Sequence, residues 1–294
     1  MKKKIVVTGA AGFLGYHLAR LAAADYEVYG FYHNKQVTTA GVTMLRCDVT
    51  NYIETGNVLD DIEPDALIHL AAVSDANYCQ QHKEESFTVN VQATENLAGI
   101  CSDFNIPFVF ASTDLVFDGK KGRYREGDAK NPLSLYGEQK AKAEEDTLKI
   151  YPKSLIVRLP LMFGAAEAGE GKYLQQFITK LKAGEAVKLF LDEYRSVCGA
   201  KSISAGILHF LFTQSGVLHL AGKQRLSRYE FGLKAAKAFG LNESLIESCL
   251  QKDVVMAAPR PADVSLDVSK ALVLGYAPLL ADEELKLIAA GSYI

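Results

Sequence analysis

Two side chains four residues apart, Tyr136 and Lys140, have the clearest potential for chemistry in this sequence of 294 residues. Their spacing places both on one face of the helix that we predict over 135–150. A free tyrosine titrates near ~10, and a lysine ammonium close by favours the phenolate, so we expect Lys140 to lower the pKa of Tyr136. Such a tyrosine could give a proton to a carbonyl oxygen. The pattern alone is weak, because any amphipathic helix can contain it.

A strand predicted over 107–112 strengthens this interpretation, because it ends in the hydroxyl residues Ser112 and Thr113. The Thr113 hydroxyl would donate a hydrogen bond to the same carbonyl oxygen and polarise it. A cofactor would deliver hydride to the carbonyl carbon, and Lys140 could also hold a nicotinamide ribose. Cys79 follows a neighbouring strand, and we interpret it as a packed thiol rather than a nucleophile.

The start of the chain supplies a place for such a cofactor. A short β-branched run, Ile5 to Val7, leads into Gly9, Gly12 and Gly15, and a helix is predicted over 13–24. In this context Gly9 allows a tight turn, Gly12 lets backbone N–H groups approach a pyrophosphate, and Gly15 lets helix and strand pack closely. A plain strand–helix turn is the alternative, but the position at the start of an alternating chain favours a phosphate site.

The residues after the next strands bear on which dinucleotide is bound. The strand over 27–32 is followed by His33, Asn34 and Lys35, with no acidic residue to accept from a ribose 2′-hydroxyl. These side chains could accommodate a 2′-phosphate, so we favour NADP(H) and leave NAD(H) open. Asp48 follows the strand over 43–47 and could accept from an adenine amino group; a capping aspartate is the alternative.

The order of the elements predicts an α/β fold with a doubly wound parallel sheet, because strands and helices alternate through the first half. Beyond residue 161 the alternation decays. The predicted strands lie at 5–7, 27–32, 43–47, 66–71, 107–112, 154–159, 188–191 and 217–221. The predicted helices lie at 13–24, 52–60, 84–101, 135–150, 173–183, 202–212, 227–239 and 282–290.

Composition narrows the class of protein. The net charge of −3 and the lack of a basic run argue against nucleic acid or an anionic membrane as partner. The five cysteines are scattered and lack CxxC spacing, so we expect no metal site, no disulfide framework and a cytoplasmic location. No stretch is long and apolar enough to span a membrane, and the basic N-terminus is better explained as the first strand than as a signal peptide.

These motifs together resemble the extended short-chain dehydrogenase/reductases over nearly the whole chain. Residues 8–15 match the cofactor fingerprint, Asp48 and Val49 the adenine clamp, and Asn90 the Asn-Val-x-x-Thr helix. The resemblance implies that Thr113, Tyr136 and Lys140 are catalytic. It implies a cofactor site formed by Gly9, Ala11, Gly12, Phe13, Leu14, Gly15, His33, Asn34, Asp48, Val49, Leu70, Ala71, Ala72, Asn90, Tyr136 and Lys140.

Within this family the chain looks most like the dTDP-4-dehydrorhamnose reductase branch of sugar-nucleotide reductases, through residues 112–119 and 260–270. The resemblance implies a substrate site of Thr113, Asp114, Arg195 and Arg260. The two arginines would hold a diphosphate; surface ion pairs are the alternative. Leu115 and Leu161 stand where the branch usually has tyrosine and tryptophan, two residues that shape the sugar pocket. The resemblance therefore does not identify the sugar.

The resemblance implies a Rossmann domain over 1–160, completed by about 201–221, and a smaller mixed α/β substrate lobe over about 161–200 and 222–294. The implied activity is NAD(P)H-dependent reduction of the 4-keto group of a nucleotide-linked deoxysugar, as in dTDP-rhamnose biosynthesis. The resemblance to this branch is compatible with a homodimer. Two alternatives remain: a non-catalytic NADP-binding protein resembling the methionine adenosyltransferase regulatory subunit, and a sugar-nucleotide epimerase. Dehydratases of the family usually have a glutamate directly after the aspartate that corresponds to Asp114. This chain has Leu115 there, which argues against a dehydratase.

Overall fold

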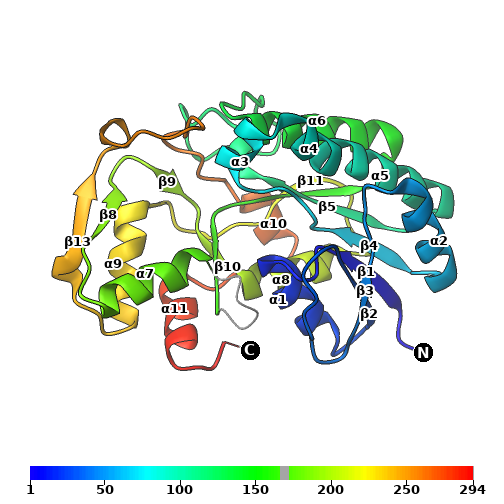
Figure 1. The fold of residues 1–294 in the computed structure, drawn as a ribbon, viewed down its shortest axis with the longest axis horizontal. Coiled ribbons are helices and arrows are strands. Elements are labelled where there is room, and N and C mark those ends of the chain that lie inside the picture. Colours follow the sequence, from blue (N-terminus) through cyan, green and yellow to red (C-terminus); the bar gives the residue numbers. More distant parts are fainter. Residues whose placement is uncertain (166–171, 294) are drawn as a thin grey trace.

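The computed structural model describes residues 1–165 and 172–293, and a parallel seven-stranded sheet is its central feature (Figure 1). The strand order is β11-β6-β5-β4-β1-β2-β3, which confirms the predicted doubly wound sheet. The strands are β1 (Lys4–Thr8), β2 (Glu27–Tyr32), β3 (Val42–Arg46), β4 (Ala66–His69), β5 (Phe108–Thr113), β6 (Leu155–Leu159) and β11 (Gly216–His219). In this topology the carboxyl ends of β1 and β4, which neighbour each other where the order reverses, form a crevice.

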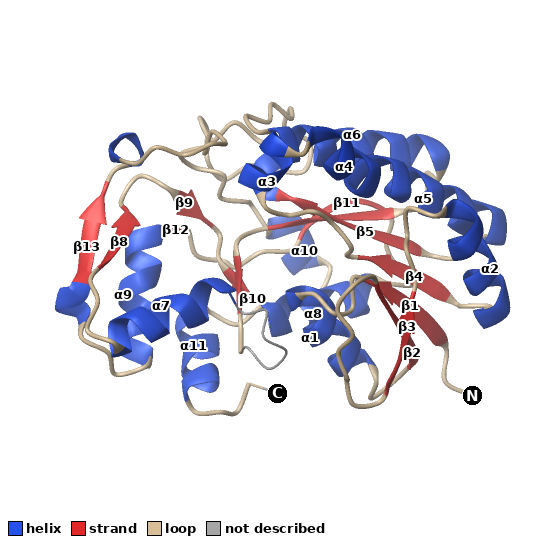
Figure 2. Cartoon of the chain, viewed as in Figure 1, coloured by secondary structure: helices blue, strands red, loops and turns tan. Residues whose placement is uncertain are grey.

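Helices cover both faces of this sheet, which explains why the central strands β1, β4, β5 and β6 are buried along most of their length. Helices α1 (Phe13–Ala22) and α8 (Ala200–Phe210) pack on one face, and α2 (Tyr52–Ile62), α5 (Ala93–Phe104) and α6 (Leu135–Ile150) on the other (Figure 2). The central strand β1 contributes Ile5 and Val7 to one core and Val6 to the other, and all three are fully buried. The alternation of side chains along a strand accounts for this division.

The segment between β4 and β5 differs from the single predicted helix. It contains α3 (Ala76–Gln81), α4 (Lys83–Phe87) and a π-helical turn η1 (Thr88–Gln92) before α5 begins. Helix α3 was not predicted because six residues are too few to show a hydrophobic period. Its start is fixed locally, since the Asp75 carboxylate accepts from the backbone N–H groups of Asn77 and Tyr78.

A second group of elements lies at the left of Figure 1, around its own apolar core that includes Phe163, Phe177 and Phe231. Short strands pair there: β7 (Met162–Phe163) with β10 (Cys198–Gly199), β8 (Val187–Phe190) with β13 (Ile246–Cys249), and β9 (Tyr194–Arg195) with β12 (Leu226–Ser227). Helices α7 (Lys172–Lys182), α9 (Arg228–Ala238) and α11 (Ala281–Ala289) complete it, and α10 (Ser269–Val273) packs beside β11. The sequence does not predict the two-residue strands β7, β9, β10 and β12, because two residues are too few to show alternation, and it does not predict β13.

Within residues 1–165 and 172–293, no helix combines the length and the apolar character needed to cross a bilayer. The five cysteines are free thiols, and all but Cys249 are buried.

Candidate active site

The glycine turn between β1 and α1 has the geometry expected from its sequence. Gly9 has a φ of 68°, and a Cβ added there would lie 2.7 Å from the backbone nitrogen of Ala71. A Cβ added at Gly15 would collide with the carbonyl oxygen of Gly9, so strand and helix pack as closely as predicted. Helix α1 begins after Gly12 without a side-chain cap. Its first N–H groups and the positive end of its dipole are therefore available to an anion.

Two cavities of about 630 and 280 Å³ meet at this turn and share Gly9, Gly12, Ala71 and Ala72. The first extends to His33 and the loops after β2 and β3. The second extends to Lys140 of α6 and to Thr113 at the end of β5. They form one groove with the glycine turn at its middle. A dinucleotide has two nucleosides joined by a pyrophosphate, so the uncapped helix end lies where that anion would need it. The residues present therefore fit NAD(P).

The structure places nearly every expected cofactor residue on this groove. The lining includes Gly9, Ala11, Gly12, Phe13, Leu14, Gly15, His33, Asn34, Asp48, Val49, Leu70, Ala71, Ala72, Tyr136 and Lys140. Asn90 is the exception, because it is fully buried and its amide bonds to protein groups. Its Oδ1 accepts from the Val73 N–H (2.9 Å), and its Nδ2 donates to the Val73 carbonyl (3.0 Å) and to Gln139 Oε1 (2.9 Å). Asn90 therefore braces the groove wall instead of lining it.

At the outer end of the groove, the two carboxylate oxygens of Asp48 have different surroundings. Oδ1 accepts from the backbone N–H and the hydroxyl of Thr50 (3.0 and 2.7 Å), whereas Oδ2 lies 3.6 Å from His33 Nε2. Partial burial acts to raise the pKa of Asp48, but the Thr50 hydrogen bonds and His33 outweigh it and lower the pKa. The N-cap of α2 is Asn51, so Asp48 caps only a local turn, and its second oxygen faces His33 on the groove wall.

At the inner end, Thr113, Tyr136 and Lys140 are 7%, 8% and 2% exposed. Burial, followed by Cys79 and Asp114, raises the pKa of Tyr136, and burial lowers the pKa of Lys140 to about 7 although Glu144 opposes the change. The expected lowering of the Tyr136 pKa by Lys140 is therefore wrong for this structure. The reason is that burial disfavours charge on both groups. Tyr136 thus keeps its proton at neutral pH, as a proton donor must.

A buried ionic cluster stands behind this end of the groove. Glu144 accepts hydrogen bonds from the Ser112 hydroxyl (2.5 Å) and from Arg158 Nε and Nη2 (2.9 and 2.8 Å), and Lys130 lies 3.4 Å away. The cluster ties β5, β6 and α6 together. Because the Ser112 hydroxyl is committed to Glu144, Thr113 is the hydroxyl of this strand end that faces Tyr136.

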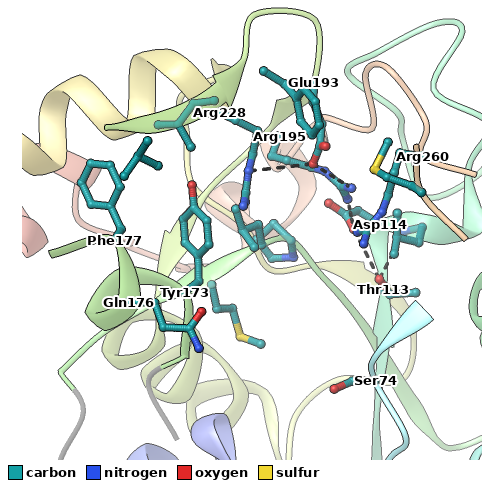
Figure 3. A pocket seen from close by; sticks show the side chains of 18 of the residues that line it. Ser74, Thr113, Asp114, Tyr173, Gln176, Phe177, Glu193, Arg195, Arg228 and Arg260 are labelled. Atoms are coloured by element: carbon teal, nitrogen blue, oxygen red, sulfur yellow. Dashed lines mark hydrogen bonds and ion pairs between the residues drawn. The ribbon is translucent and has the colours of Figure 1, made fainter. Parts of the chain in front are cut away.

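A third cavity of about 600 Å³ opens from Thr113 and Tyr136 toward the second group of elements (Figure 3). Asp114, Arg195 and Arg260 line it, as expected of substrate residues. Arg195 is not a surface ion pair: its Nη1 contacts Asp114 Oδ1 (2.9 Å) and its Nη2 contacts Glu193 Oε1 (3.4 Å), all nearly buried. Burial raises the pKa of Asp114 despite the opposing Arg195.

Several buried polar atoms of this cavity lack a hydrogen-bond partner within residues 1–165 and 172–293, which is unusual in folded proteins and typical of a ligand site. They are Asp114 Oδ2, Arg195 Nε, Arg260 Nε and the Tyr173 hydroxyl. Sequence reasoning missed Tyr173, Glu193 and Arg228, which also line the cavity. Glu193 lies two residues before Arg195, and that spacing in a strand could have placed both on one face. No comparable pattern marks Tyr173 or Arg228, which come from the starts of separate helices.

The class of protein follows from where the groove ends. A dinucleotide lying across the glycine turn would bring one end to a buried proton donor, next to a cavity for a second molecule. This arrangement is that of an NAD(P)-dependent oxidoreductase with a Rossmann fold.

Residues 2–286 match the RmlD substrate binding domain family, and the chain belongs to that family. The chain is 34% identical over 268 residues to a probable low-salt glycan biosynthesis reductase, Agl14, of Haloferax volcanii, covering 90% of this chain and 89% of that protein. It is 27% identical over 286 residues to methionine adenosyltransferase 2 subunit beta of Danio rerio, covering 93% and 85%. A solved dTDP-4-dehydrorhamnose reductase of Bacillus anthracis in complex with NADP superposes with a TM-score of 0.88 at 22% identity, covering 99% and 100%.

Proposed function

We propose that this protein reduces the 4-keto group of a nucleotide-linked deoxysugar to a hydroxyl group, with NADPH as the reductant. One observation carries the proposal: Thr113 and Tyr136 line both the dinucleotide groove and the third cavity. A carbonyl group held at this junction would contact both hydroxyls and face the inner end of the groove. Proximity of this kind is a large part of catalysis by oriented groups.

In the proposed reaction, bound NADPH supplies the hydride that reduces the carbonyl carbon. Tyr136 donates its hydroxyl proton to the carbonyl oxygen, so one hydride and one proton yield the alcohol. Thr113 holds the same oxygen; its hydroxyl lies 3.3 Å from Asp114 Oδ1 and accepts from the Leu115 N–H at 3.2 Å. Lys140, buried one helical turn after Tyr136, holds the ribose, and Tyr136 regains its proton from water after product leaves.

We assign the cofactor contacts to the groove residues named above and favour NADP(H) over NAD(H). The loop after β2 supports this preference, because His33, Asn34 and Lys35 line the outer cavity and no acidic side chain follows the strand. We assign sugar-nucleotide contacts to Thr113, Asp114 and Arg260. We further propose that residues 161–200 and 222–294 act as the substrate lobe of the Rossmann domain.

A binding role without turnover is the second candidate, favoured by the similarity to the beta subunit of methionine adenosyltransferase 2. A pure NADP binder needs the groove and Lys140 but has no use for Tyr136 as a proton donor. The presence of Thr113 and Tyr136 at the junction of the cavities therefore supports the reductase.

Substitution of Tyr136 by phenylalanine tests the proposal, since it removes only a hydroxyl. We expect NADPH binding, followed by fluorescence titration, to persist. Consumption of NADPH with a dTDP- or UDP-linked 4-keto-6-deoxyhexose should fall by ~10²–10⁴-fold, as is typical for loss of a general acid. Tyr151→Phe is the matched control, because Tyr151 is also buried but lies at the far end of α6. Full turnover by Tyr136→Phe would refute the mechanism.

A further inference from the structure

The arginines around the third cavity are not equally available to a ligand. Arg195 is held between two carboxylates, and the side chains of Arg195, Asp114 and Glu193 are only 5%, 3% and 7% exposed. Two negative charges already surround this one cation. Giving its Nη atoms to a ligand would take from Asp114 and Glu193 the cation closest to each of them, which is costly for buried carboxylates.

Arg228 is differently placed, at the first residue of α9. Its guanidinium carbon lies 3.9 Å from the centre of the Tyr173 ring, and its Nε forms a long ion pair with Glu193 Oε1 at 4.0 Å, beyond hydrogen-bond distance. Within the described part of the chain, the Arg228 guanidinium donates no hydrogen bond. Stacking on an aromatic ring fixes the plane of a guanidinium while leaving its N–H edge free. With 15% of its side chain exposed, Arg228 presents this edge to the cavity.

A second observation at the same wall points to a ligand. The Tyr173 hydroxyl is buried and has no hydrogen-bond partner among the residues that the structure describes, and in Figure 3 it points toward Arg228. Burial raises the pKa of Tyr173, so the hydroxyl keeps its proton as a donor. Arg260, whose buried Nε also has no partner in the described part of the chain, lies across the cavity beside Asp114 (Figure 3). Donors thus face the cavity from two sides, with the Arg195–Glu193 pair between them.

We propose that Arg228 and the Tyr173 hydroxyl bind the diphosphate of the sugar nucleotide from one side while Arg260 binds it from the other. Arg195 is then a positioning residue that fixes Asp114 next to Thr113. The inference rests on the proposed function and names the groups that hold its substrate. A diphosphate has enough charge and acceptor oxygens for two guanidinium groups, and each can bind it through paired hydrogen bonds.

Calorimetric titration with dTDP and with UDP, in the presence of NADPH, tests the assignment. Arg228→Gln should weaken binding of the preferred nucleotide by roughly tenfold or more, because a charge-assisted hydrogen bond is lost, and should leave the Kd for NADPH unchanged. Tyr173→Phe, which removes one hydroxyl, should weaken it by about 3–10-fold. Arg225→Gln is the matched control: Arg225 also stacks on a tyrosine ring (3.5 Å) and contacts a carboxylate (2.7 Å), but it lies outside this cavity.

Arg195 gives a contrasting readout in steady-state kinetics. Arg228→Gln should raise KM with little change in kcat, whereas Arg195→Gln should lower kcat, because Asp114 moves, and Arg195→Lys should restore part of it. Unchanged nucleotide binding in both Arg228→Gln and Tyr173→Phe, with wild-type binding intact, would overturn the inference and leave the proposed function standing. If the wild-type protein binds NADPH but neither dTDP nor UDP, the sugar-nucleotide function fails and the inference fails with it.

Discussion

Replacing Glu144 with glutamine removes one negative charge from the buried cluster behind the active site and keeps the shape of the side chain. Glu144 and Arg158 are 1% and 3% exposed, and Arg158 donates two hydrogen bonds to the carboxylate. A glutamine retains one acceptor oxygen but turns an amide N–H₂ toward a guanidinium N–H. The Arg158 cation is then left buried without its counter-charge, which costs roughly 3–5 kcal/mol of the free energy of unfolding.

Urea denaturation measures this loss as a shift of the midpoint at constant slope. Glu145→Gln is a close control: Glu145 is the next residue, also contacts Lys130 (3.0 Å), but has a side chain that is 57% exposed. An exposed ion pair of this kind contributes about 0–1 kcal/mol to the free energy of unfolding. The urea midpoint of Glu145→Gln should therefore be close to that of the wild type. Equal midpoints for the two variants would refute the view that this cluster holds β5, β6 and α6 together.

The same cluster predicts a pH dependence. Burial acts to raise the pKa of Glu144, but Arg158 and Ser112 outweigh it, so the pKa lies below its ordinary value of 4.5. An acid with a lowered folded-state pKa stabilises the fold above its unfolded pKa and loses that contribution as the pH falls through the folded value. The difference in stability between wild type and Glu144→Gln should therefore be largest above pH 4.5 and shrink in more acidic buffer.

Three further predictions use other parts of the site. NADPH should bind at least as tightly as NADH in fluorescence titrations, and a clear preference of the wild type for NADH would contradict this. His33→Asp should shift the preference toward NADH, because the new carboxylate offers an acceptor to the ribose 2′-hydroxyl. Arg260→Ala should raise KM for a sugar nucleotide with the Kd for NADPH nearly intact, and an unchanged KM would remove the case for its role in binding. Burial, then Lys140, lowers the pKa of His69 from 6.5 to about 3, so the folded chain binds fewer protons between these values. Stability should therefore fall as the pH drops from 6.5 toward 3, by up to about 1.4 kcal/mol per pH unit from this group, and His69→Gln should flatten that part of a urea-midpoint profile.

The local sequence determined the elements whose residues carry their own signals. The predicted strand 27–32 and helix 135–150 coincide with β2 and α6. The glycines fixed the turn after β1, because a Cβ at Gly9 or Gly15 would collide with neighbouring backbone. The four-residue spacing of Tyr136 and Lys140 placed both on one helix face. These features depend on backbone sterics and periodicity, which act over a few residues.

Only the tertiary structure decided the chemical state of those residues and the partners of the cations. The pKa of Tyr136 is raised and that of Lys140 lowered because segments distant in sequence exclude water from both. Arg195 pairs with Asp114, 81 residues away, and Arg228 stacks on Tyr173 from another helix. Burial and long-range contacts arise when separate elements pack together, and no local pattern encodes which side chains will meet. The sequence therefore specified the groove and its reactive residues, while packing determined their protonation and which arginine faces the cavity.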